Sequence, residues 1–145
     1  MKSTVVSVAL EALPEFACTL LQELRGGDEW GLSGQLGAGK TTLVREIVRA
    51  LGGGDVVSSP TFVLSHEYTV KEPVLTVEHW DLYRLKSLPE ELYYPPDVSV
   101  LRLIEWPERS DALLARLTGT IFLSPEGGDP TVNGRNIEVV RRTGR

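Results

Sequence analysis

Residues 34–41 read Gly34-Gln35-Leu36-Gly37-Ala38-Gly39-Lys40-Thr41 and satisfy the pattern G-x-x-x-x-G-K-[ST]. The glycines of this pattern let backbone N–H groups converge on phosphate oxygens without a Cβ atom in the way. Lys40 is expected to reach the β- and γ-phosphates, and the Thr41 hydroxyl to bind Mg²⁺. A helix that begins here adds its positive N-terminal end to the same anion site. The octapeptide predicts a phosphate-binding loop; the alternative is a glycine-rich turn that happens to precede a helix.

The segments on either side of the octapeptide decide between these two interpretations. Residues 29–33 are short and partly apolar, as expected of a strand. Residues 40–51 are expected to form a helix, and they place Leu43, Ile47, Ala50 and Leu51 on one face of it. The glycines at 52–54 then end this helix. A strand, a glycine loop and a helix in this order are the context that the phosphate-binding loop requires.

The rest of the chain alternates between segments typical of strands and of helices. Strands are expected at residues 4–8, 74–77 and 100–104, an extended arm at 62–70, and a closing hairpin at 120–123 and 137–140. Helices are expected at residues 11–24, 87–92 and 111–117, the last capped by Ser110. This alternation predicts an α/β fold like that of P-loop NTPases, with a mainly parallel sheet, flanking helices and antiparallel additions. No linker-like stretch divides the chain, so residues 1–145 are expected to form a single P-loop nucleotide-binding domain.

The composition is that of an ordinary globular domain. The chain has 145 residues, of which 41% are hydrophobic and 24% charged, and its formal net charge is −5. This negative charge argues against a protein that holds nucleic acid by bulk electrostatics. Residues 135–145 nevertheless carry four arginines and one glutamate. We expect this basic tail to be solvated, and contact with RNA or an acidic partner is the alternative.

Cysteine usage and hydropathy indicate a cytoplasmic protein. Cys18 is the only cysteine, so the chain can form no intramolecular disulfide. Its apolar neighbours predict a buried, unreactive thiol. No apolar run approaches the ~18–20 residues of a membrane helix, and Glu11 interrupts the apolar N-terminal stretch, so neither a membrane anchor nor a signal peptide is expected. One cysteine and two histidines without ligand spacing also exclude a zinc site.

Two short apolar segments end in acidic residues. Residues 74–77 lead into Glu78-His79-Trp80-Asp81, and residues 100–104 lead into Glu105. Nucleotide phosphates and their metal lie at the carboxyl ends of such strands, where one acid can hold Mg²⁺ and another can orient the attacking water. The alternative is that both acids merely mark where strands reach the surface, and the spacing alone leaves the two possibilities open.

Four motifs in order resemble the TsaE (YjeE) family, small bacterial ATPases required for making threonylcarbamoyladenosine in tRNA. They span residues 34–108 and read Leu36-Gly37-Ala38-Gly39-Lys40-Thr41-Thr42, Ser59-Pro60-Thr61-Phe62, His79-Trp80-Asp81-Leu82-Tyr83-Arg84-Leu85 and Ile104-Glu105-Trp106-Pro107-Glu108. Outside them the chain resembles the family only in length and pattern.

The resemblance implies a role for each matching residue. Catalytic roles fall to Lys40, to Asp81 as the acid for hydrolysis, and to Thr61 in a switch-like loop near the γ-phosphate. Thr41 and Glu105 would share the Mg²⁺. The residues expected to bind ATP are Gly34, Gln35, Leu36, Gly37, Ala38, Gly39, Lys40, Thr41, Thr42 and Trp106. For His79 and Tyr83 packing and chemistry are both open, and Trp80 is expected in the core.

The chain departs from the family pattern at two places. Gln35 stands where the family usually has aspartate, which removes a negative charge near the phosphates. The segment 93–97 is shorter than the corresponding segment of the family, so the resemblance implies neither a local fold nor a partner surface there.

The function expected from the motifs and the resemblance is Mg²⁺-dependent ATP hydrolysis in support of threonylcarbamoyladenosine formation. The resemblance implies that the chain acts on a complex of partner proteins resembling TsaB and TsaD, and that contact with tRNA is indirect. One alternative is a nucleotide-dependent interaction module with incidental hydrolysis, and another is a small-metabolite kinase. A kinase lid is not evident, because Arg45, Arg49, Arg84 and Arg102 are scattered, and the Asn-Lys-x-Asp motif of GTPases is missing.

Overall fold

The computed structural model describes residues 2–53, 56–58, 65–71, 74–129 and 131–142. Its strands are β1 (Lys2–Ala9), β2 (Glu29–Ser33), β3 (Val56–Ser58), β4 (Ser65–Lys71), β5 (Val74–Asp81), β6 (Val100–Glu105), β7 (Gly119–Pro125) and β8 (Gly134–Arg141). Its α-helices are α1 (Leu13–Leu20), α2 (Lys40–Ala50) and α3 (Asp111–Arg116). Short 3-10 helices are η1 (Leu10–Ala12), η2 (Glu90–Tyr93), η3 (Pro107–Arg109) and η4 (Glu126–Gly128).

Within the described residues, eight strands form one sheet in the order β1-β8-β7-β2-β6-β5-β4-β3. The four central strands β7, β2, β6 and β5 run parallel, while β8 and β1 at one edge and β4 and β3 at the other pair antiparallel. This confirms the predicted P-loop NTPase-like α/β class, with its parallel core and antiparallel additions. The carboxyl ends of β2, β6 and β5 therefore meet at one edge of the sheet.

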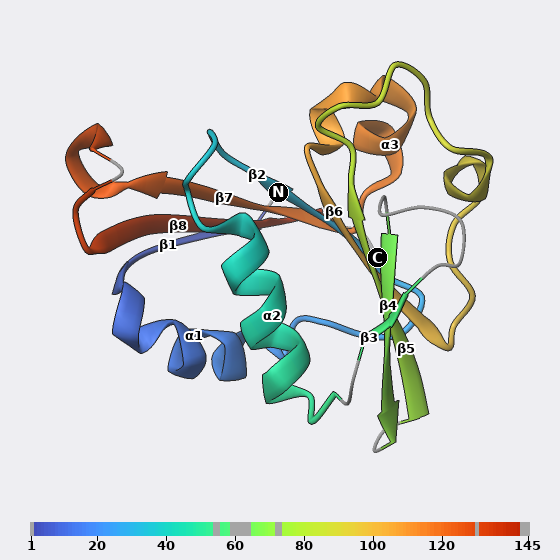
Figure 1. Cartoon of the computed structure of the whole chain (residues 1–145), viewed down its shortest axis with the longest axis horizontal. Helices are drawn as coiled ribbons and strands as arrows, with labels where there is room; N and C mark the ends of the chain where they lie inside the picture. Colours follow the sequence, from blue (N-terminus) through green and yellow to red (C-terminus); the bar gives the residue numbers. More distant parts are fainter. Residues whose placement is uncertain (1, 54–55, 59–64, 72–73, 130, 143–145) are drawn as a thin grey trace.

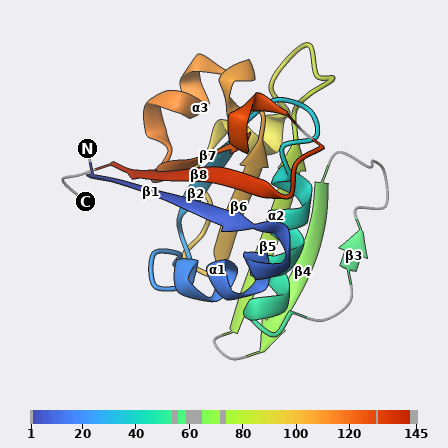
Figure 2. The same ribbon diagram turned by 90° about the vertical axis from the view of Figure 1, so that its left-hand side faces the viewer.

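Helices cover both faces of this sheet. α1 and α2 pack side by side on one face, and α3 lies on the other (Figures 1 and 2). The larger hydrophobic core includes Leu13, Leu43 and Ile47 from the helices, whereas a smaller core forms around Ile104 and Leu113. β6 supplies both cores because its successive side chains point to opposite faces.

The predicted elements recur with shifted bounds. The helix expected at 11–24 is a 3-10 turn followed by α1, and the turns expected at 87–92 are η2. The strand expected at 74–77 continues to Asp81, so all four residues after Val77 belong to β5. The arm expected at 62–70 is β4 from Ser65 onward, and residues 62–64 lie outside the described part. Ser110 caps α3 as predicted: its side chain accepts a hydrogen bond from the Leu113 backbone N–H at 3.2 Å.

Two helix faces differ from the prediction. On α2 the buried apolar side chains are Leu43, Val44, Ile47 and Val48, while Ala50 and Leu51 are half-buried at the edge of the core. On α1 the buried face contains Leu13, Ala17 and Leu20, so Cys18 is exposed. The prediction of a buried Cys18 thiol was wrong, because the neighbouring positions 17 and 20 take the core-facing side of the helix.

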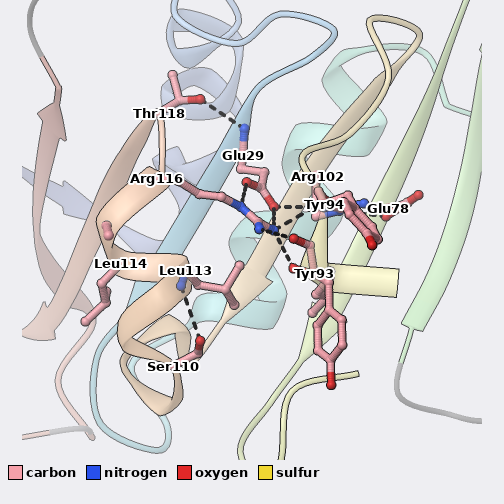
Figure 3. Close-up of polar contacts among 12 residues, drawn as sticks. Glu29, Glu78, Tyr93, Tyr94, Arg102, Ser110, Leu113, Leu114, Arg116 and Thr118 are labelled. Atoms are coloured by element: carbon pink, nitrogen blue, oxygen red, sulfur yellow. Dashed lines mark hydrogen bonds and ion pairs between the residues drawn. The ribbon is translucent and has the colours of Figure 1, made fainter. Parts of the chain in front are cut away.

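A buried ion-pair cluster joins β2, β6 and α3 (Figure 3). Glu29 lies 2.8 Å from Arg102 Nη1 and 2.7 Å from Arg116 Nε, and Arg102 also contacts Glu78 at 2.9 Å. Both arginines donate in addition to backbone carbonyls of the segment around η2, among them Tyr93 and Tyr94. The cluster thereby anchors the backbone at Tyr93 and Tyr94 to the sheet. Arg102 serves the fold and is not available to a kinase-type lid.

None of the helices in the described part of the chain is long and apolar enough to cross a membrane.

Candidate nucleotide-binding site

The glycine loop follows β2 at the edge where the parallel strands end, and α2 begins at Lys40 (Figure 1). Gly34 has φ +156°, and a Cβ atom there would lie 2.3 Å from the Leu123 carbonyl oxygen of β7. Gly39 caps α2 in the left-handed conformation, with φ +101°. A side chain would clash at the first position and strain the backbone at the second, so the two glycines are required by close approach and by conformation respectively.

Lys40 is buried within its own loop. Its Nζ donates to the carbonyls of Gly34 and Gln35, the latter at 3.0 Å, and lies 4.2 Å from the centre of the Trp106 ring. Burial lowers the pKa of Lys40, while the negative charges of Glu105, Glu108 and Asp81 partly oppose that shift. The ammonium group therefore sits among acceptors and an aromatic face at the entrance of α2.

The carboxylate of Glu105 lies at the centre of the site. Its Oε2 accepts a hydrogen bond from Thr41 Oγ1 at 2.7 Å and lies 2.6 Å from His79 Nε2. Burial alone would raise the pKa of Glu105, but the hydrogen bonds from His79 and Thr41 and the charges of His79 and Lys40 outweigh it and lower the pKa. A buried, ionised carboxylate next to a threonine hydroxyl is a pair of hard oxygen donors of the kind that Mg²⁺ prefers.

Asp81 and Trp106 complete the site at the carboxyl ends of β5 and β6. Asp81 is the direct register partner of Glu105 on the neighbouring parallel strand, it is exposed, and its Oδ1 accepts from the Tyr83 backbone N–H at 3.0 Å. Trp106 directly follows β6 with φ +62°, a left-handed conformation that is uncommon for a bulky residue. Its ring packs against Tyr83 with centroids 4.8 Å apart. The backbone turn after β6 thus directs the indole toward the loop.

These groups surround a cleft of about 460 Å³. Of the residues predicted to form the site, those lining the cleft are Leu36, Gly37, Gly39, Lys40, Thr41, Thr42, Asp81, Glu105 and Trp106. Gly34, Gln35 and Ala38 belong to the same loop without lining the cleft, and Trp80 is buried in the smaller core as predicted. Thr61 lies outside the described residues, so its place in a switch loop stays a prediction.

Sequence reasoning missed several cleft residues. Leu10 and Leu13 line the cleft from the N-terminal segment, and Arg135 lines it from β8. Arg135 was expected in a solvated basic tail, yet it is only 5% exposed and its Nε donates to the Ala38 carbonyl at 3.1 Å. The period-two alternation with Ile137 could have placed it on the inward face of a strand.

Arg141 and Arg142 are half-exposed, so they are partly solvated as predicted, but both also contact the fold. Arg141 Nη1 donates to the Glu23 carbonyl at 2.9 Å, and Arg142 Nη2 donates to the Leu114 carbonyl at 3.0 Å. Both side chains therefore tie the end of β8 to neighbouring elements; Arg145 lies outside the described residues.

Comparisons with known proteins find a matching family model, similar sequences and a similar solved structure. The sequence model of Threonylcarbamoyl adenosine biosynthesis protein TsaE matches residues 8–132. A tRNA threonylcarbamoyladenosine biosynthesis protein TsaE from Synechocystis sp. is 39% identical over 107 residues, which are 69% of this chain and 67% of that protein. Its counterpart from Haemophilus influenzae is 37% identical over 119 residues, 77% of this chain and 69% of that protein. The crystal structure of Bacillus subtilis YdiB superimposes with a TM-score of 0.66 and 26% identity, covering 97% of this chain and 86% of YdiB.

Proposed function

This chain belongs to the TsaE family of tRNA threonylcarbamoyladenosine biosynthesis, and we propose that it binds ATP with Mg²⁺ in the cleft and hydrolyses it. The observation that carries the proposal is the meeting of Thr41, Glu105 and Asp81 beside the glycine loop, at the ends of β2, β6 and β5. This is where a P-loop enzyme needs its metal ligands and the acid that orients water.

The donor set fits Mg²⁺. Thr41 Oγ1 and Glu105 Oε2 are hard oxygen donors 2.7 Å apart. Within the described residues, no three histidine, cysteine, aspartate or glutamate side chains gather into a metal cluster. A site with few protein ligands suits Mg²⁺, which keeps waters and takes phosphate oxygens as its other ligands. When bound, the metal would neutralise charge on the phosphates.

Four side chains of the site have separate roles in the proposed reaction. The Thr41 hydroxyl donates a hydrogen bond to Glu105, which leaves the lone pairs of the Thr41 oxygen for a ligand in the cleft. His79, 2.6 Å from the same carboxylate, holds Glu105 in place from β5. Lys40 exchanges the carbonyls of Gly34 and Gln35 for phosphate oxygens and stabilises the charge that develops during transfer. Asp81, exposed at the edge of the cleft, orients the attacking water.

The cellular role of this turnover follows from the family. We propose that the chain acts in the cytoplasm, as a single domain, on a complex of partner proteins resembling TsaB and TsaD, and that hydrolysis resets the complex. The carbamoyl-threonyl group is then carried by the partners, and tRNA is contacted only through them. Membership in a biosynthetic family named for the modified nucleoside supports this placement.

The test is the rate of ATP hydrolysis in three mixtures: the chain alone, the chain with the partner complex, and the chain with the complex and tRNA. We expect the rate to change when the complex is added. An identical rate in all three mixtures would contradict a role on that complex.

A matched variant separates hydrolysis from binding. Asp81→Asn keeps the shape of the side chain and should abolish turnover while ATP still binds. If this variant nevertheless supported full threonylcarbamoyladenosine formation in cells, the chain would act as a nucleotide-dependent interaction module instead. Formation of ADP that required a small acceptor would indicate a metabolite kinase.

A further inference from the structure

The guanidinium of Arg135 binds main-chain carbonyls on two sides. On one side its Nε and Nη2 donate to the loop carbonyls of Ala38 and Gly37, at 3.1 and 3.4 Å. On the other its Nη1 donates to the carbonyls of Val132 and Gly134, at 2.7 and 3.0 Å. The planar fork of arginine suits such contacts, because its five N–H donors have a fixed geometry. Arg135 therefore connects the phosphate-binding loop to the β7–β8 hairpin.

Other carbonyls of the loop are also held by donors that do not take part in phosphate binding. The Gln35 carbonyl accepts from the Ala38 N–H at 3.1 Å, and the Gly39 carbonyl accepts from the Leu43 N–H at 2.9 Å. Together with the Gly37 and Ala38 carbonyls held by Arg135, these oxygens are kept from turning toward a bound phosphate, which they would repel. The contacts remain when Lys40 moves to a phosphate.

The orientation of one peptide group follows from the Arg135 contact. The Ala38 carbonyl and the Gly39 N–H belong to the same planar trans peptide, so they point in opposite directions. An Ala38 oxygen fixed on the Arg135 side directs the Gly39 N–H away from Arg135. Backbone N–H groups of this loop are the donors that a phosphate uses.

The hairpin that carries Arg135 is hydrogen-bonded to the N-terminal segment. Arg135 lies on β8 opposite Pro125 of β7. Nearby, Asn133 accepts hydrogen bonds from the Leu10 N–H through both its carbonyl and its side-chain oxygen, at 3.2 and 3.1 Å. The Asn133 amide also donates to Glu11 at 2.8 Å. The hairpin end is thus tied to the N-terminal segment, whose Leu10 also lines the cleft.

We propose that Arg135 is a positioning residue for phosphate binding, which acts by holding the peptides after Gly37 and Ala38 in the orientation that presents the Gly39 N–H. The proposal rests on the proposed nucleotide site. It reaches beyond the part of the chain that the family model matches, which ends at residue 132. The ligand it serves is the diphosphate portion of a nucleotide, and the nucleoside portion is not involved.

The experiment compares the binding of ADP and of inorganic pyrophosphate by calorimetry, with Mg²⁺ present. In Arg135→Gln we expect both ligands to bind weaker by about tenfold or more, because a hydrogen-bonded network around the loop is lost. We expect the same from Arg135→Lys, which keeps the charge but loses the planar fork. An equal loss of affinity for ADP and for pyrophosphate would show that Arg135 acts on the binding of the phosphates.

Arg141→Gln is the matched control. Arg141 lies on the same strand and, six residues on, on the same face as Arg135, and it also donates to a main-chain carbonyl. Its partner is Glu23, so the variant removes an arginine without touching the loop. We expect wild-type affinity for both ligands. Circular dichroism at the binding temperature verifies that each variant is folded.

Several outcomes would overturn the inference. Wild-type affinity in Arg135→Gln would show that the loop needs no support, and wild-type affinity in Arg135→Lys would show that charge alone suffices. A loss for ADP but not for pyrophosphate would place Arg135 on the nucleoside. A wild-type chain that bound neither ligand would overturn the proposed site as well, whereas one that bound both without hydrolysing ATP would leave this inference standing.

Solvent exchange of the Arg135 side chain tests the inference on the unaltered protein. The Arg135 Nε–H resonance should remain protected from solvent exchange when ADP is added, since the contact with Ala38 persists in the bound state. Loss of this protection on binding would contradict a positioning role.

Discussion

The Nζ atom of Lys40 lies 4.2 Å from the centre of the Trp106 ring, so the ammonium rests on the indole face while it donates to carbonyls of its own loop. A cation at this distance is attracted by the ring quadrupole. A phosphate in the cleft would compete for the same ammonium. The pair therefore links the position of Lys40 to the environment of one tryptophan.

The first prediction uses Trp106 as a reporter of nucleotide binding. The chain has three tryptophans, of which Trp30 and Trp80 are buried in the two cores, while Trp106 lines the cleft. Adding ADP with Mg²⁺ should change the tryptophan fluorescence as Lys40 leaves the ring. Trp106→Phe should abolish the change. A change of the same size in that variant would mean that the signal arises in one of the cores.

The second prediction concerns the charge of Lys40. Lys40→Ala should lower turnover on the order of 10²-fold, because the charge developing on the phosphates loses its nearest cation. The measurement is steady-state ATP hydrolysis by the chain in the presence of the proposed partner complex. Lys86→Ala removes an exposed lysine outside the cleft and should leave the rate unchanged. An unaltered rate in Lys40→Ala would show that the loop is not the catalytic cradle.

The third prediction is a pH dependence of stability that originates at Glu105. The folded protein lowers the pKa of this carboxyl below its unfolded value of about 4.3. The stability that it contributes is therefore present in full above about pH 4.3 and is lost as the pH falls through the folded pKa. At pH 7 we expect Glu105→Gln to be less stable than the wild type by about 1–3 kcal/mol.

The measurement is urea unfolding of both proteins from about pH 3 to about pH 7, without nucleotide and without Mg²⁺. This range brackets the ordinary carboxyl pKa of about 4.3. The difference between the two proteins should shrink toward the acid end of this range. A difference that stayed constant with pH would show that Glu105 has the same pKa in the folded and unfolded chains.

The fourth prediction concerns the buried cluster around Glu29. Glu29→Gln removes the carboxylate charge shared by Arg102 and Arg116, and breaking a buried pair in this way costs about 3 kcal/mol of unfolding free energy. Urea unfolding measures the loss. Glu90→Gln, at an exposed position of η2, should change stability by less than about 0.5 kcal/mol. Equal stabilities of the two variants would show that the two arginines do not need the charge of Glu29.

Local patterns in the sequence were sufficient to predict the strand–loop–helix unit, the order of most elements and the α/β class. They were sufficient because each pattern is written in neighbouring residues: the glycines of residues 34–39, the apolar period of α2, and the Ser110 cap of α3. The strand-end position of Asp81 and Glu105 could be predicted for the same reason, since each acid ends its own apolar segment.

The remaining features depend on contacts between distant segments. Strand register brings Asp81 opposite Glu105, and the sheet order brings β8 close enough for Arg135 to reach the loop, 97 residues earlier in the chain. Cys18 is exposed because packing against α2 selects which side of α1 is covered. A sequence pattern gives the face and the end of an element, but long-range pairing sets which faces and ends meet. The phosphate-binding loop could therefore be recognised from its own residues, whereas its support by Arg135 is a property of the folded sheet.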